Sequence, residues 1–285
     1  SGPFGVSSPP DPRSWLAAPG DDPIRMPYLD IFTLPENAEA GGIASGTEQY
    51  YSFDYGNVHI VSLDSQLSAR DADQRATMRT WLIDDLSSHS ADWTIVIFHH
   101  PPYSKGANHD SDTTDTRGTI DLPQLLMREE FVGVFDEYGV DLVYGGHSPS
   151  YERSYYLHDH TESSDMFTAA AHAELVDNDP ARPASGRDGE AYAQLSPTSG
   201  GVDDRVVYTV AGNGGKADED AGRLTAPEVW LQHPAHIEQP ADTESPPRRG
   251  LPIIGSVIVD AGENTLTASF INVDGDVLDR FSITR

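Results

Sequence analysis

The sequence predicts an α/β fold in which helices alternate with buried strands. The middle of the chain alternates strand-like apolar runs with stretches at helical spacing, and the runs 94–98 and 140–144 consist mostly of apolar or β-branched residues. Strands of that composition are typical of parallel sheets with both faces covered. The length of 285 residues is sufficient for one large domain with a sizeable core.

The first ordered element is expected after an irregular N-terminal segment. Residues 1–49 are rich in Pro, Gly and Asp and show little periodicity. Aromatic residues then alternate over 51–55, Gly56-Asn57 marks a turn, and an apolar run follows over 58–63. Alternation around a Gly-Asn turn predicts a β-hairpin.

Two helices are predicted on either side of the buried strand 94–98. The second helix, over 125–139, ends at Gly139, a residue type suited to the left-handed conformation that follows many helices. Another buried strand, 140–144, comes directly after it. The first helix lies within 71–89, where four apolar residues recur at helical spacing: Met78, Trp81, Leu82 and Leu86.

The chain is expected to form a single domain over 1–285 that is closed by antiparallel strands. Residues 157–205 and 216–250 have the composition of long surface loops. Residues 251–285 alternate apolar and polar positions through three strands separated by Gly-containing turns. This last pattern predicts a closing β-meander.

Composition excludes several classes of function. The net charge of −28 disfavours binding to nucleic acid or anionic membranes, and we favour solubility over a specific partner as the explanation of the acidic surface. The chain has no cysteine, so disulfides, thiolate catalysis and cysteine zinc sites are excluded. No apolar stretch approaches the ~20 residues of a membrane span, and no signal peptide is visible.

Two histidines stand directly after buried strands. His99 follows 94–98 and His147 follows 140–144, in each case next to Gly or Pro. Ligand sites in such sheets lie at the carboxyl ends of strands, and a neutral imidazole there can bind a divalent cation. The pattern alone leaves a metal site and ordinary loop histidines as alternatives. His59, inside a strand, is expected to be a core histidine with hydrogen-bond partners.

Several segments, in order, resemble one protein family. They are "YYSFDYGNVHIVSLDSQ", "WTIVIFHHPPYSKG", "MREEFVGVFDEYGVDLVYGGHSPSYERSY" and the closing meander. From about Pro27 to the C-terminus the chain resembles the calcineurin-like metallophosphoesterases, and among these the bacterial branch similar to purple acid phosphatases. The occurrence of several motifs in the right order is more specific than any single motif.

The resemblance implies a fold, a cofactor and a reaction. The fold would be a four-layer αββα sandwich, here apparently lacking its first strands. The cofactor would be a pair of divalent or mixed-valence metal ions of the Fe, Zn or Mn class at the strand ends. The reaction would be hydrolysis of a small phosphate mono- or diester by a metal-bound hydroxide, because two cations lower the pKa of bound water and neutralise phosphoryl charge. The resemblance also suggests an extracellular or periplasmic location.

The same resemblance assigns expected roles to single residues. His99 and His147 would bind metal. His109, in "SKGANHD", would lie near the leaving group of the substrate as a catalytic residue. Tyr151 and Arg153 would support the site from behind.

The chain departs from the family pattern at identifiable positions. The family carries a His-x-His pair, whereas here the pair becomes His147-Ser148-Pro149, and proline cannot bind a metal. An upstream Asn-His motif also has no counterpart, and Asp21 or Asp22 would have to substitute for it. The aspartates of the first family strands would precede residue 1.

These departures leave three hypotheses. The chain is a phosphoesterase whose site is completed by upstream or substitute ligands. Alternatively, it is a catalytically degenerate domain that acts as a binding or surface module. In the third hypothesis it is a fragment that pairs with a missing N-terminal segment or a partner chain, because a sheet lacking strands exposes an edge and a core face.

Overall fold

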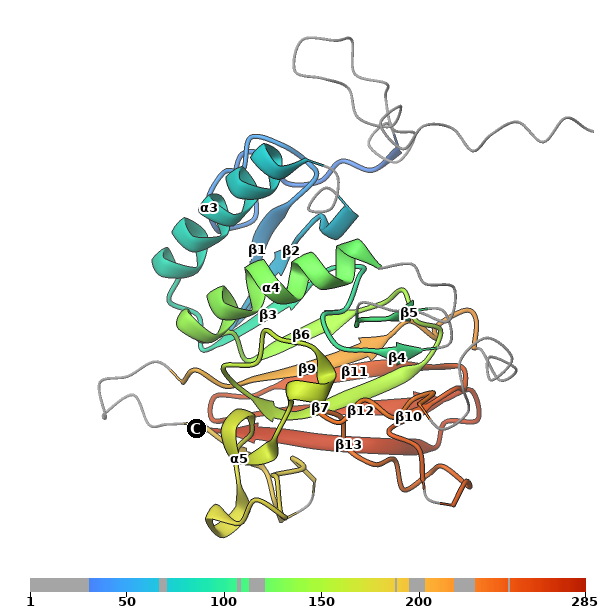
Figure 1. Cartoon of the computed structure of the whole chain (residues 1–285). Coiled ribbons are helices and arrows are strands. Elements are labelled where there is room, and N and C mark those ends of the chain that lie inside the picture. Colours follow the sequence, from blue (N-terminus) through green and yellow to red (C-terminus); the bar gives the residue numbers. More distant parts are fainter. Residues whose placement is uncertain are drawn as a thin grey trace, which may run out of the picture.

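The larger of two stacked sheets organises the molecule. The computed structural model describes residues 31–66, 71–106, 109–112, 121–187, 189–194, 203–217, 229–245 and 247–285. Within these ranges, a seven-stranded mixed sheet packs on a four-stranded sheet, and two long helices lie on the other face of the larger sheet (Figure 1). The α/β fold class predicted from the sequence is therefore confirmed.

The order of the large sheet places four strand ends side by side. Strands β2, β3, β6 and β9 are mutually parallel, whereas β1, β7 and β10 run antiparallel to their neighbours. The carboxyl ends of the four parallel strands therefore meet at one edge. In spatial order the strands are β1 (Tyr51–Tyr55), β2 (Val58–Ser62), β3 (Trp93–Ile97), β6 (Leu142–Gly145), β9 (Val206–Ala211), β7 (Tyr151–Leu157) and β10 (Gly250–Leu251).

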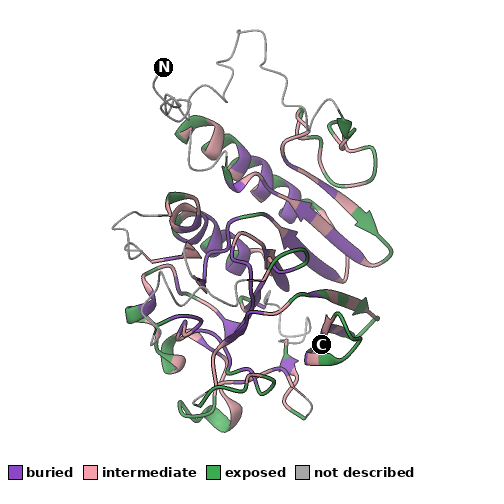
Figure 2. Ribbon diagram, turned by 90° about the vertical axis from the view of Figure 1, so that its right-hand side faces the viewer, coloured by how far each residue is buried: buried purple, intermediate pink, exposed green. Residues whose placement is uncertain are grey.

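The predicted hairpin and both predicted helices are present. Helix α3 (Ala72–Ser88) begins after Asp71, whose carboxylate accepts hydrogen bonds from two backbone N–H groups of the first turn. Helix α4 (Leu122–Glu137) ends before Gly139, which has a φ of +68° as the sequence predicted. Both helices pack on the strand residues that point to this face of the large sheet, and Figure 2 shows the buried residues gathered between these layers.

The smaller sheet packs against the opposite face. It contains the predicted meander of β11 (Gly255–Ala261), β12 (Thr265–Asn272) and β13 (Val277–Thr284), to which β8 (Tyr192–Ala193) adds in parallel. Alternate residues of the two sheets form a second core, including Trp93 and Phe281. The outward side chain of Ile258 is 57% exposed, so no helix in the described ranges covers this strand. The described residues thus supply three of the four layers that the family resemblance implies.

The two segments expected as surface loops are more packed than that expectation. Residues 157–205 hold β8, helix α5 (Ala169–His172) and the 3₁₀ turns η2 (Ser164–Met166) and η3 (Val176–Asn178). Within 216–250, described residues such as Leu231 are fully buried. This burial could not be predicted from the polar, Pro-rich sequence of the two segments, because isolated apolar residues form no helical or strand periodicity.

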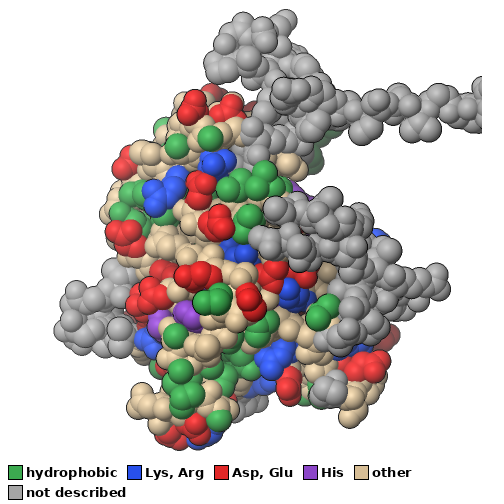
Figure 3. All heavy atoms as spheres, viewed as in Figure 1, with side chains coloured by type: hydrophobic (Ala, Val, Ile, Leu, Met, Phe, Trp, Pro, Cys, Tyr) green, Lys and Arg blue, Asp and Glu red, His purple; other side chains and the backbone are tan. Residues whose placement is uncertain are grey.

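None of the helices in the described ranges has the length and apolarity that crossing a bilayer requires. The face of the molecule shown in Figure 3 carries many acidic side chains, with Lys and Arg between them. This distribution fits the net charge of −28.

Candidate metal site

The two histidines singled out in the sequence lie together. Strands β3 and β6 are adjacent and parallel, so the residues that follow them leave the same edge of the sheet. The backbone N–H of Gly146 donates to the carbonyl of His99 at 2.9 Å and ties the two loops. The Nδ1 atom of His147 is 3.1 Å from the Nε2 atom of His99. The parallel pairing thus converts two positions 48 residues apart into one site.

A third histidine, His100, joins this pair. One nitrogen from each of His99, His100 and His147 lies within 4.8 Å of the others, which is a spacing that could hold a metal ion. The Nδ1 atom of His100 is 2.8 Å from the hydroxyl of Ser65, which also accepts the backbone N–H of His100. Sequence reasoning missed His100. The signal was the doubled histidine before Pro101-Pro102, because residues beyond a strand end need not alternate between faces.

Asp121 contacts the other side of His147. Its Oδ2 atom is 2.7 Å from Nε2 of His147, and His109, Asp121 and His147 form a second group with ligand atoms within 4.8 Å. The rings of His109 and His147 are 4.2 Å apart between centroids. The site therefore also contains the residue that the resemblance assigned to the leaving group. Asp121 could not be recognised from the sequence, because it reads as an ordinary cap of α4.

Burial favours the neutral imidazoles of His99 and His100. Desolvation, together with the nearby His147 and His99, lowers the pKa of His100 to about 3. Desolvation and the nearby His147 also lower the pKa of His99. Burial alone would raise the pKa of Asp121, but its hydrogen bond with His147 brings the pKa below the ordinary value. At neutral pH His99 and His100 therefore present unprotonated nitrogens and Asp121 presents a carboxylate, the forms that bind cations.

The turn that carries His147 is tightly packed against its neighbours. A Cβ on Gly145 would lie 2.7 Å from Pro101, and one on Gly212 would lie 2.0 Å from the backbone oxygen of Ser148. Both positions therefore require glycine for close approach. His147 itself has a φ of +60°, in the left-handed region that L-residues seldom adopt.

A buried carboxylate holds the turn from below. Glu152 accepts hydrogen bonds from the hydroxyl groups of Ser104 and Ser150, at 2.8 and 2.9 Å. Its second oxygen is 3.2 Å from Nδ1 of His236. Burial would raise the pKa of Glu152, but these partners, His236 foremost, lower it. An ionised carboxylate thus joins the loops after β3 and β6.

The positions at which the sequence departs from the expected family pattern lie only partly within the described residues. Pro149 is buried in the turn and offers no donor atom, as the sequence indicated. Asp21 and Asp22 lie outside the described residues. The donors that could hold a metal near the strand ends are therefore those of the two groups above, within the described part of the chain.

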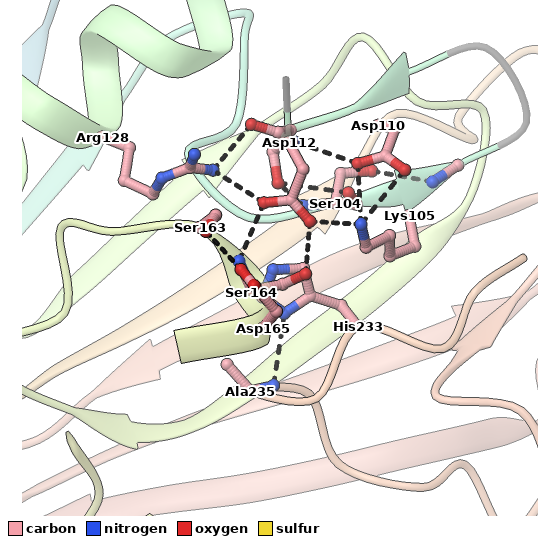
Figure 4. A network of polar contacts seen from close by, with 12 residues as sticks. Ser104, Lys105, Asp110, Asp112, Arg128, Ser163, Ser164, Asp165, His233 and Ala235 are labelled. Atoms are coloured by element: carbon pink, nitrogen blue, oxygen red, sulfur yellow. Dashed lines mark hydrogen bonds and ion pairs between the residues drawn. The ribbon is translucent and has the colours of Figure 1, made fainter. Parts of the chain in front are cut away.

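A polar network fixes the hairpin that carries His109 (Figure 4). Strands β4 (Lys105–Gly106) and β5 (His109–Asp110) pair, and the ammonium of Lys105 is 2.9 Å from Asp110 and also contacts Asp112. The guanidinium of Arg128 in α4 donates to the carbonyl of Ser111 at 2.7 Å. These contacts bind the hairpin to the main body and so position His109.

Tyr151 and Arg153 lie behind the site. The guanidinium of Arg153 donates twice to Asp279, at 2.8 and 2.9 Å, and the Tyr151 hydroxyl donates to the same carboxylate at 2.9 Å. Arg153 is on β7 and Asp279 is on β13, so the pair joins the two sheets. Both side chains are therefore engaged in holding the two sheets together.

His59 has the partners expected of a core histidine. Its two ring nitrogens are 2.7 Å from Asp54 and 2.9 Å from Asp85. The imidazole is fully buried and stacks on His89 with centroids 4.3 Å apart. His59 therefore has no place in the candidate metal site.

An acidic cavity opens beside the histidines. It has a volume of about 320 Å³, enough for a small ligand, and His99 and His100 form part of its wall. Glu48 and Asp64 also line it, whereas no Lys or Arg is among its described lining residues. An anionic ligand would therefore be repelled unless a cation at the histidines reversed the local field.

Comparisons with known proteins agree with the sequence motifs. The family model described as calcineurin-like phosphoesterase matches residues 13–151, a range that includes the histidine cluster. Purple acid phosphatase 23 of Arabidopsis thaliana is 29% identical over 137 residues, which are 47% of this chain and 26% of that protein. Purple acid phosphatase 15 of the same plant is 30% identical over 130 residues, 45% of this chain and 21% of that protein.

A solved structure is also similar in part. The purple acid phosphatase PPD1 from yellow lupin (Lupinus luteus) seeds has a TM-score of 0.49 and 18% identity, covering 89% of this chain and 38% of that one. This chain thus spans about a quarter of the length of the curated relatives that it matches. The family-model match and these sequence similarities to purple acid phosphatases support a metallophosphoesterase assignment for this part of the chain.

Proposed function

We propose that the protein is a metal-dependent phosphoesterase that hydrolyses small phosphate mono- or diesters. The observation that carries this proposal is the convergence of His99, His100 and His147 beside an acidic cavity. A cation bound there would polarise the phosphoryl group and make an attacking water more acidic. The donor set fits such an ion, since the three residues each offer an imidazole nitrogen and these atoms lie within 4.8 Å of one another.

The chain's own residues would orient the substrate and handle the leaving-group proton. His109 projects from a braced hairpin with its ring 4.2 Å from that of His147. We assign it the role of donating a proton to the leaving oxygen, because imidazole is the side chain best suited to proton transfer near neutral pH. The cavity next to His99 and His100 would accommodate the organic part of a small ester.

The decisive test is turnover of a generic aryl phosphate as a function of metal. Protein purified without chelator should hydrolyse the ester, EDTA should abolish the activity, and added Zn²⁺ or Mn²⁺ should restore it. His147→Ala should remove both bound metal and activity. His172→Ala is the matched control, because His172 is on α5 and belongs to none of the groups of described residues that could hold a metal. Equal activity in the wild type and His147→Ala would refute the assignment.

A second candidate function rests on Pro149, which stands where the family has a metal-binding histidine. In that case the domain is catalytically degenerate and acts as a binding or surface module. It would show no turnover with any of the metals above. Pro149→His would then be expected to raise the amount of metal bound, and an unchanged metal content would remove Pro149 as the cause.

The proposal extends to partners and location. A missing N-terminal segment or a partner chain could complete the site, because the chain covers only 26% of a relative such as purple acid phosphatase 23. We propose an extracellular or periplasmic location on the basis of the family resemblance. Cell fractionation with antibody detection tests this, and recovery in the cytosol alone would contradict it.

A further inference from the structure

We propose that this chain builds a single cation site from His99, His100 and His147, oriented by Asp121, in place of the metal pair that the family resemblance implies. The inference rests on the proposed function only in taking the histidine cluster to be a metal site. It names two residues, His100 and Asp121, that the sequence motifs do not single out. It also changes the expected stoichiometry from two metal ions to one.

The two nitrogens of His147 have different partners and hence different roles. Nε2 is 2.7 Å from the Asp121 carboxylate, a distance typical of a strong charge-assisted hydrogen bond. That contact places the proton on Nε2 and leaves the lone pair on Nδ1. Nδ1 is the atom that faces His99. A carboxylate that fixes the tautomer of a metal-binding histidine is a common arrangement around zinc.

The distances bear on which of these residues could share one metal ion. With metal–ligand bonds of about 2.05 Å, the 3.1 Å separation of the His147 and His99 nitrogens gives an angle of about 98° at a shared metal, close to tetrahedral. The same bond lengths with the 2.7 Å separation of His147 and Asp121 give only about 82°. Asp121 is therefore placed to orient His147 and not to share a tetrahedral cation with it.

The position of Asp121 supports this role independently. Asp121 stands at the N-cap of α4, where an aspartate ordinarily accepts hydrogen bonds from the first backbone N–H groups. Here its side chain makes no such bond and contacts His147. The helix therefore lacks the stabilisation of an N-cap side chain, typically about 1 kcal/mol, because the Asp121 carboxylate contacts His147.

His100 has a comparable arrangement. Its Nδ1 atom contacts the hydroxyl of Ser65, so Nε2 is the nitrogen left to act as a ligand. Three imidazole nitrogens with a fourth position open to the cavity are the donor set of a catalytic zinc site. Such a set favours Zn²⁺ or Co²⁺ over Mg²⁺ or Ca²⁺, which prefer oxygen ligands. A second ion of the family type would need donors at Pro149, which has none.

The test is a titration of metal-free full-length chain with Co²⁺, followed by visible absorption and equilibrium dialysis. We expect one Co²⁺ per chain and the intense visible bands of a four-coordinate ion. Asp121→Asn should weaken binding by about 10- to 100-fold with the bands retained. His100→Gln should abolish the four-coordinate spectrum. The matched controls are Asp73→Asn, in the exposed first turn of α3, and His172→Ala, on α5, and both should leave the affinity unchanged.

The outcomes separate this inference from the proposed function. Two Co²⁺ ions per chain, a six-coordinate spectrum, or an unchanged affinity in Asp121→Asn would overturn the single-site proposal, even if the protein turns over phosphate esters. One tightly bound ion without turnover would support the site and refute the phosphoesterase assignment. Circular dichroism of each variant establishes that it is folded, and Asp121→Asn, which keeps the side-chain shape, remains decisive if His100→Gln fails to fold.

Discussion

Replacing Asp279 with asparagine should destabilise the protein by breaking the ion pair between the two sheets. Arg153 and Asp279 are both fully buried, and the carboxylate accepts two hydrogen bonds from the guanidinium. Asparagine keeps the size of the side chain but leaves the positive charge of Arg153 without its partner. Removing one member of a buried pair typically costs about 3–5 kcal/mol.

Part of this cost can be worked from the acid–base behaviour of Asp279. Burial would raise the pKa of Asp279, but the charge of Arg153 lowers it from 3.8 to about 2. Lowering the pKa of a carboxyl group to this extent corresponds to roughly 2–3 kcal/mol. Because the pKa is lowered on folding, this stability is present above pH 4 and is lost as the pH falls toward 2. The remainder of the expected cost is the burial of an unpaired guanidinium.

Urea denaturation followed by tryptophan fluorescence measures the effect. We expect Asp279→Asn to lower the free energy of unfolding by about 3–5 kcal/mol at pH 7 and to reduce its decline between about pH 4 and 2. Asp260→Asn, on the exposed face of β11, is the matched control and should stay within about 0.5 kcal/mol of the wild type. A loss below about 1 kcal/mol in Asp279→Asn would refute the view that this pair joins the sheets.

Three further predictions concern other parts of the molecule. Burial would lower the pKa of His59, but hydrogen bonds to Asp85 and Asp54 raise it. The free energy of unfolding should therefore fall as the pH rises from 6.5 through the pKa of the folded state. Urea denaturation at a series of pH values should show a weaker decline of this free energy in His59→Gln than in the wild type. Gly212→Ala would force a methyl group to within 2.0 Å of the Ser148 carbonyl, so we expect a loss of about 1–3 kcal/mol in thermal melts together with weaker Co²⁺ binding; unchanged binding would show that this turn does not position His147. Asp71→Ala removes the cap of α3 and should cost about 1 kcal/mol in the same melts, whereas an unchanged Tm would contradict the capping role.

Local patterns predicted much of this fold because their causes are local. The hairpin of β1 and β2 depends on alternation and a Gly-containing turn, and α3 depends on one apolar stripe, all of which are visible in a short window of sequence. His99 and His147 were predicted for the same reason, because each directly follows a buried strand. The parallel order of β3 and β6 then brings them together.

The rest of the site depends on contacts between distant segments. Asp121 carries an N-cap signal, and only its proximity to His147 shows that the side chain has another partner. His100 lies next to a predicted ligand, but its direction depends on the turn at Pro101 and on Ser65. The packing of residues 157–205 follows from contacts that no periodicity announces, such as the burial of Tyr192 against the smaller sheet.

The left-handed backbone conformation of His147 lowers local stability but places its imidazole in the candidate metal site. A non-glycine residue at φ +60° carries a strain on the order of 1 kcal/mol, which glycine would not. His147→Gly should therefore fold at least as well in its backbone while losing the imidazole. A chain required only to fold would be better served by glycine at this position. The strain is tolerable because the conformation turns Nδ1 toward His99 and Nε2 toward Asp121 at the same time.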